Sequence, residues 1–238
     1  MVDFTKSYQQ AMEANQDRDL AFQAIFRAVY KWMTVGLVAS GLTAWWTVES
    51  GLYKVVFSGF NFLFLAIGEL VLVGVLSARI DKFSSMTAKV LFIAYSVLNG
   101  LTLSSIFLAY TISSIQIVFF LTAGMFGGLA FFGTMTKMDL SKIGSICMMG
   151  LWGIVLAIIV NIFLKSGPLD WAISFIGIFI FTGLTMWDAQ KIRLMAENAS
   201  GLGDRSVTHR LAILGALALY LDFINLFLML LNLFGRRR

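Results

Sequence analysis

Seven long apolar runs divide most of this 238-residue chain. A helix rises 1.5 Å per residue, so about 20 apolar residues cross the roughly 30 Å hydrocarbon core of a bilayer. The runs lie at about 32–48, 55–78, 90–110, 115–134, 144–164, 171–192 and 211–234. With 59% hydrophobic and 13% charged residues, the chain is too apolar for a soluble globule. We therefore expect an all-α integral membrane protein, a seven-transmembrane-helix bundle.

The N-terminal segment is polar and of mixed charge, which is not the pattern of a cleaved signal peptide. We expect residues 1–31 to form a cytoplasmic N-terminal arm and residues 32–238 to form a single transmembrane domain. Lysine and arginine are enriched in cytoplasmic loops, and this orientation places most of them inside. Besides the arm, the loops that carry them are 79–89, 135–143 and 188–210. Seven spans place the arginines at 236–238 outside, so either the last element is re-entrant or the tail departs from the rule, and we favour the second.

Three acidic residues, Glu69, Asp188 and Asp222, stand in or beside apolar runs. An ionised acid inside a bilayer costs several kcal/mol unless it is paired, so such acids indicate an ion or proton site. Counted from the expected cytoplasmic helix ends, these acids and Asn99 lie at depths of about 13 to 18 Å. We therefore predict that all four face one interior layer, with the two aspartates within direct or one-water hydrogen-bonding reach. Hydrogen bonding between helices is the alternative role for such polar residues.

Several functional classes are excluded by residues that the chain lacks. Cys147 is the only cysteine and His209 the only histidine, which removes disulfides, cysteine metal sites and histidine-based triads. The basic residues flank membrane segments and form no nucleic-acid stripe. The run 211–234 contains no lysine for a retinal Schiff base. We expect no enzyme activity and no cofactor.

An intramembrane aspartyl protease is a weak alternative. The sequence Gly-Leu-Gly-Asp at 201–204 and the pair Trp187-Asp188 are superficially similar to the motifs of that family. Asp204, however, follows a polar loop beside Arg205, and the proline motif of the family is absent, because Pro168 is the only proline. We therefore expect Asp204 to be a solvated loop acid.

Three motifs together resemble the transmembrane Bax inhibitor motif family (the Bax inhibitor-1 type), in particular its compact bacterial members. The most specific is Leu-Tyr-Leu-Asp-Phe-Ile-Asn-Leu-Phe at 219–227, which is followed by Leu-Leu-Asn-Leu-Phe-Gly at 230–235. The others are Asp-Ala-Gln-Lys-Ile at 188–192 and Asn-Gly-Leu-Thr-Leu-Ser-Ser at 99–105. The resemblance covers nearly the whole chain. It departs at Trp187, where the family usually has tyrosine, because an indole donates a hydrogen bond but cannot accept one.

The resemblance implies a bundle in which the seventh helix is central and a pH-sensitive calcium leak is gated by two aspartates that share a proton. Carried over by position, Asp188 and Asp222 resemble the di-aspartyl sensor, and Glu69 resembles the acid of the second helix. Arg79 resembles the residue that latches the pair from the cytoplasmic side. Two carboxyl groups in hydrogen-bonding contact titrate as one unit, which would give a pH switch without histidine.

Calcium prefers oxygen ligands. Glu69, Asp188 and Asp222, with Asn99, offer only oxygens from their acceptor groups and would form a weak calcium transit site. The alternative is a non-transporting protein that regulates cell survival or membrane-protein quality control by binding membrane partners. The glycines within 124–128 suit such helix contacts, but internal packing explains them equally well. The expected partners are the lipid bilayer and calcium, and compact loops favour a bacterial inner membrane.

Overall fold

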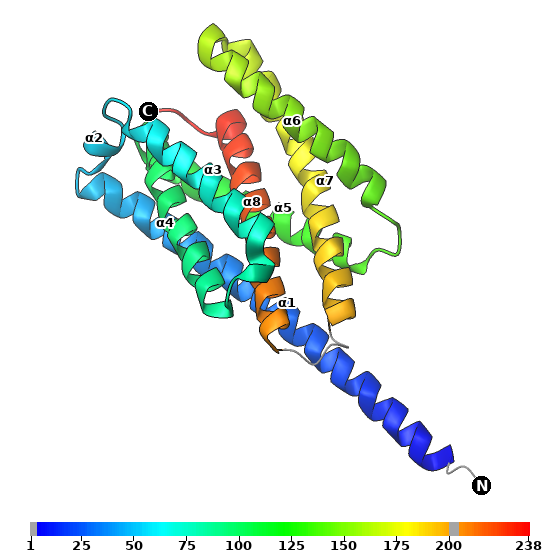
Figure 1. Cartoon of the computed structure of the whole chain (residues 1–238). Coiled ribbons are helices and arrows are strands. Elements are labelled where there is room, and N and C mark those ends of the chain that lie inside the picture. Colours follow the sequence, from blue (N-terminus) through cyan, green and yellow to red (C-terminus); the bar gives the residue numbers. More distant parts are fainter. Residues whose placement is uncertain (1–3, 200–204) are drawn as a thin grey trace.

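The computed structural model describes residues 4–199 and 205–238, and in these ranges almost every residue is helical. Eight α-helices and one short 3₁₀ helix, η1, follow one another along this described part of the chain (Figure 1). They are α1 (Phe4–Glu49), α2 (Tyr53–Val56), α3 (Asn61–Arg79), η1 (Ile80–Lys82), α4 (Ser85–Ala109), α5 (Ile112–Met135), α6 (Ser141–Leu164), α7 (Gly167–Ala199) and α8 (Arg205–Phe234). The expected all-α membrane fold is confirmed.

The structure supports a membrane-spanning role for six of the expected seven helices. Within the described residues, six helices are long and apolar enough to cross a membrane: α3 extended by η1, and α4 to α8. The first apolar run, 32–48, is not among them, because it is short and continues a polar helical segment without a break. The expected arm and the first run thus form one helix, and the division into two regions stays a prediction.

The long helix of the second apolar run begins later than we expected. Residues 55–78 are not one helix: α2 ends at Val56 and α3 starts at Asn61. Gly59 lies between them with φ of 53°, a left-handed conformation that is easy only for glycine. Asn61 holds this turn, because its side-chain amide donates to the carbonyl of Val55 at 2.8 Å.

The last helix, α8, forms the centre of the bundle. In its apolar window 72% of the residues are buried inside the protein, against at most 39% in the other five candidate spans. It packs against α1, α4, α5 and α7, whereas α3 packs mainly on α4, and α6 on α7. The expected central position of the C-terminal helix agrees with this arrangement, but the outer helices surround it incompletely.

Glycines set the closest helix contacts. A side chain at Gly144 of α6 would collide with the Trp187 ring of α7, and one at Gly100 of α4 would collide with the backbone of Ser40 in α1. Gly124, Gly127 and Gly128 of α5 have open space instead, so internal packing does not explain them.

Candidate functional site

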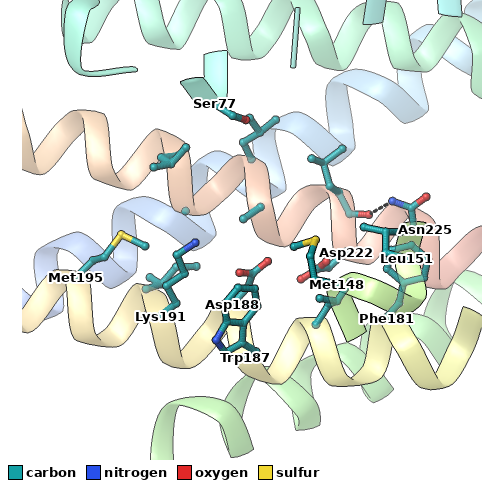
Figure 2. A pocket seen from close by; sticks show the side chains of 17 residues that line it. Ser77, Met148, Leu151, Phe181, Trp187, Asp188, Lys191, Met195, Asp222 and Asn225 are labelled. Atoms are coloured by element: carbon teal, nitrogen blue, oxygen red, sulfur yellow. Dashed lines mark hydrogen bonds between the residues drawn. The ribbon is translucent and has the colours of Figure 1, made fainter. Parts of the chain in front are cut away.

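The structure brings Asp188 of α7 and Asp222 of α8 together (Figure 2). The two carboxyl groups lie near enough to interact electrostatically, and both line one cavity. Asp222 is only 5% exposed, and its Oδ2 has no hydrogen-bond partner among the described residues. Asp188 is half-buried. A buried carboxylate oxygen without a partner is costly, and such groups in native proteins call for a specific explanation.

Both aspartates line a cavity of about 470 Å³. Its walls come from α7 and α8 and from the two helices on either side, α3 and α6, which contribute the exposed Ser77 and Met148. Most of the lining is apolar, and Asn225 adds an amide one turn beyond Asp222. The cavity is therefore open between α3 and α6 and leads to a carboxyl pair at the centre of the protein.

The cation beside the pair is Lys191. Its ammonium group lies 5.1 Å from the centre of the Trp187 ring, and both residues line the cavity. Lys191 forms no ion pair with Asp188 among the described residues, although it is near enough to act on it electrostatically. Trp187 thus makes a cation–π interaction with Lys191. This interaction needs an aromatic ring but no hydroxyl group.

Glu69 and Asn99 lie in a different cluster. Glu69 Oε1 accepts a hydrogen bond from Thr102 at 3.0 Å, and Oε2 accepts one from Asn99 Nδ2 at 3.3 Å. The Tyr220 hydroxyl donates to Asn99 Oδ1 at 2.8 Å and contacts Ser40 Oγ at 2.6 Å. We call this chain of groups from α1, α8, α4 and α3 the Tyr220 network.

The two polar clusters lie on different sides of α8. Tyr220 and Asp222 are two residues apart, so their side chains leave the helix about 200° from each other. Among the described residues, no three acidic, histidine or cysteine side chains gather closely enough to hold a metal ion. Glu69 therefore does not lie with Asp188 and Asp222 in this structure, because equal depth in the membrane does not fix the direction in which a side chain points. The weak calcium transit site stays a prediction.

The expected latch is not formed either. Arg79 is exposed at the end of α3 and makes no ion pair with Asp188. The physical reason is that α3 packs mainly on α4, which keeps its end away from α7. The role of Arg79 in gating stays a prediction. Asp204 lies outside the described residues.

Two residues of the motif region have a role that the sequence reasoning missed. Gln190 accepts a hydrogen bond from the Leu140 N–H at 2.9 Å and donates to the Met138 carbonyl at 2.7 Å. Arg193 donates to the Thr134 carbonyl at 2.8 Å. Both hold the connection between α5 and α6 against α7. The sequence signal for this role was Gln190 itself, which is a polar residue on the buried side of α7.

The C-terminal tail is fixed to the opposite end of the bundle from the N-terminus (Figure 1). The N–H of Arg238 donates to the Ala109 carbonyl at 3.0 Å. Arg237 contacts Asp170 of α7 at 3.5 Å and donates to Asn232 of α8 at 2.8 Å. The basic tail is thus held by an acidic partner.

These features define a helical membrane protein with a buried carboxyl pair beside a cavity that opens between helices. The chain belongs to the family described as "Inhibitor of apoptosis-promoting Bax1", whose model matches residues 22–238. This confirms the resemblance inferred from the motifs.

The chain has relatives in several bacteria. The inner membrane protein YbhL of Escherichia coli (strain K12) is 50% identical over 218 residues, which cover 91% of this chain and 93% of YbhL. An uncharacterized protein of Borreliella burgdorferi is 41% identical over 240 residues, or 100% of this chain and 99% of the relative. The uncharacterized protein YrjE of Lactococcus lactis is 37% identical over 222 residues, covering 92% and 93% of the two chains.

Proposed function

We propose that this protein is a pH-sensitive calcium leak channel of the bacterial inner membrane, in which Asp188 and Asp222 share a proton and gate the ion. The observation that carries the proposal is the contact between the two carboxyl groups beside a cavity. With one shared proton the pair holds one negative charge, and loss of that proton brings two like charges together at the centre of the bundle. The pair thus supplies a titrating element between packed helices.

The cavity offers calcium a set of oxygen ligands that differs from the expected one. Asn225 donates its Nδ2 to the Leu221 carbonyl at 2.8 Å, which leaves its amide oxygen as an acceptor. Asp188, Asp222 and Asn225 line the same cavity. Two carboxylates and one amide are too few for a tight calcium site, which suits an ion that must also leave.

The proposal includes a membrane topology with seven spans. The start of α1 and the end of the chain lie at opposite ends of the bundle (Figure 1), which supports an odd number of crossings. The seventh span of the proposal is the second half of α1, which packs on α4 and α8. With the start of α1 in the cytoplasm, the part of the cavity that Lys191 lines lies toward the cytoplasmic side of the bilayer. The inner membrane location follows from the name of the Escherichia coli relative.

A second candidate function is partner binding without transport. Gly124, Gly127 and Gly128 are exposed on α5 with open space around them, and small residues of this kind let two membrane helices approach closely. This observation favours a role in cell survival or membrane-protein quality control through another membrane protein.

One experiment separates the two functions. The purified protein is placed in liposomes without other proteins, and calcium, sodium and potassium entry are measured at several pH values. Calcium entry that changes with pH supports the leak channel. Absence of flux for every ion overturns it and leaves partner binding.

A further inference from the structure

We propose that the cavity beside the aspartate pair binds a primary ammonium group carried on an apolar chain. Such a ligand is either a free amphiphilic amine or the ethanolamine headgroup of a lipid. This site goes beyond the proposed channel function, since it depends on the shape and charge of the cavity and would exist whether or not calcium passes.

The first argument is the set of hydrogen-bond acceptors. Asp222 is 95% buried and lines the cavity, and its Oδ2 has no partner among the described residues. Asp188 lines the cavity beside it, and Asn225 keeps its amide oxygen as an acceptor because its nitrogen donates to Leu221. A primary ammonium has three N–H donors, which matches three acceptor groups.

The second argument is charge. A pair that shares one proton carries one negative charge, and Lys191 forms no ion pair with it. A single ammonium group would neutralise the pair. In a region of low dielectric constant, a carboxylate paired with an ammonium group is more stable than an isolated carboxylate. A carboxylate or phosphate ligand would instead meet a charge of its own sign, and an alcohol would leave the negative charge without a partner.

The third argument is the wall of the cavity (Figure 2). The residues that surround the rest of the space are apolar, which suits a hydrocarbon chain: Leu151, Phe181, Leu184, Leu214, Leu217 and Leu221. A volume of about 470 Å³ falls within the usual range of small-molecule sites. The opening between Ser77 and Met148 faces away from the bundle core, so a ligand would enter from the bilayer.

The test measures saturable binding of tritiated dodecylamine to the full-length protein in phosphatidylcholine nanodiscs without calcium, by scintillation proximity. Unlabelled dodecylamine, dodecanol and dodecanoate are the competitors, because they share the chain and differ in the headgroup. We expect only the amine to compete. The double variant Asp188→Asn with Asp222→Asn should weaken binding at least about tenfold, because it removes the buried negative charge. Each single variant keeps one carboxylate and should bind the amine more tightly than the double variant.

The matched control is Glu69→Gln, which removes a carboxylate from the other side of α8 and should leave amine binding at the wild-type level. Monodisperse elution and an unchanged helical circular dichroism spectrum verify that each variant is folded. No saturable binding by the wild type, equal competition by dodecanoate, or wild-type affinity in the folded double aspartate variant would overturn the proposal.

A second arm identifies the source of the ammonium group. The same measurement is repeated in nanodiscs that contain both phosphatidylethanolamine and phosphatidylcholine. Only phosphatidylethanolamine has a primary ammonium group, because the quaternary nitrogen of phosphatidylcholine has no N–H. Weaker dodecylamine binding in the mixed discs supports the site and assigns it to a lipid headgroup. Unchanged binding supports the site and assigns it to a free amine.

Discussion

The two sides of α8 treat buried polar groups in opposite ways. On one side, Tyr220 joins a network in which the Glu69 carboxylate accepts two hydrogen bonds. On the other side, Asp222 keeps an oxygen without a partner and lines a cavity. A fully satisfied buried network makes a structure rigid and specific, whereas an incompletely satisfied one stores free energy that a proton or ligand can release. We call the hydrogen-bonded side with Tyr220 the structural side and the side with the aspartate pair, where the proposed function lies, the functional side.

The largest expected effect is on the functional side. Asp222→Asn keeps the shape of the side chain but removes one titrating group, so Asp188 no longer shares a proton with a second carboxyl group. We expect the ratio of calcium flux at about pH 6 to that at about pH 8 to approach about one. The measurement is calcium entry into proteoliposomes across this pH range.

The double variant sharpens the same result. Asp188→Asn alone should also flatten the pH profile, and combining it with Asp222→Asn should add little, because two coupled groups titrate as one unit. A wild-type pH profile in Asp222→Asn would remove the shared proton from the mechanism, even if calcium still passes.

The next largest effect is expected on the unfolding free energy, from a substitution at the contact between Gly144 and Trp187. Gly144→Ala places a methyl group against the Trp187 ring, which holds Lys191 beside the pair. Overpacking of this kind costs about 1–3 kcal/mol of unfolding free energy. The measurement is a denaturant titration in micelles, followed by circular dichroism.

Gly124→Ala is the matched control for this substitution, because nothing lies within 4 Å of the added methyl group. Its unfolding free energy should stay within about 0.5 kcal/mol of the wild type. Equal losses in the two variants would show that the effect belongs to the helix backbone and not to the contact with Trp187.

A smaller loss is expected on the structural side. Tyr220→Phe removes the hydroxyl that links Ser40 and Asn99, so we expect a loss of about 1–2 kcal/mol in the same titration. The pH dependence of calcium flux should remain, since the aspartate pair is unchanged. If this variant lost its pH dependence at full stability, the two sides of α8 would form one functional unit.

The smallest effect is expected from Asp139→Asn, in the exposed connection between α5 and α6. Hydrogen bonds from Ser141, first from its hydroxyl and then from its N–H, hold the pKa of Asp139 below its usual range. The Ser141 N–H donates to Asp139 Oδ1 at 2.9 Å. Stability from a carboxyl group with a lowered pKa is present above the pKa of the unfolded chain and is lost as the pH falls through the folded pKa. Asp139 therefore stays ionised between about pH 6 and pH 8.

The flux profile of Asp139→Asn should consequently match the wild type over that range, and a flattened profile would show that any loop acid can set the pH dependence. Any difference in unfolding free energy between this variant and the wild type should be constant over the same range and shrink only in acid. Denaturant titrations at several pH values check this.

Apolar runs were enough to predict the helical membrane fold, because hydrocarbon tolerates only helices or closed barrels. They could not predict the start of α3, which depends on the left-handed Gly59 and the side chain of Asn61. Nor did they show that the run at 32–48 continues a polar helix, since hydropathy alone marks the apolar part and says nothing about where the backbone stops being helical.

The candidate site was predictable in part. Asp188 and Asp222 were predicted from their motifs and from their positions in or beside apolar runs. Carboxylates in a membrane are energetically costly and are usually functional. Depth counted along a helix placed Glu69 in the same layer, but depth carries no information about rotation around α8. The hydrogen bonds of Tyr220 with Asn99 and Ser40 connect residues far apart in sequence, and no local pattern specifies them.

The position of α8 has a consequence for how the protein is made. Ribosomes deliver the chain from the N-terminus, so the helix that forms the centre of the bundle leaves the exit tunnel after the helices that pack on it. Until then these earlier helices enter the bilayer without the surface on which α1, α4, α5 and α7 finally pack. Assembly is therefore completed only after α8 has been made, and a chain that stops before Arg205 would present unfilled helix surfaces to membrane proteases.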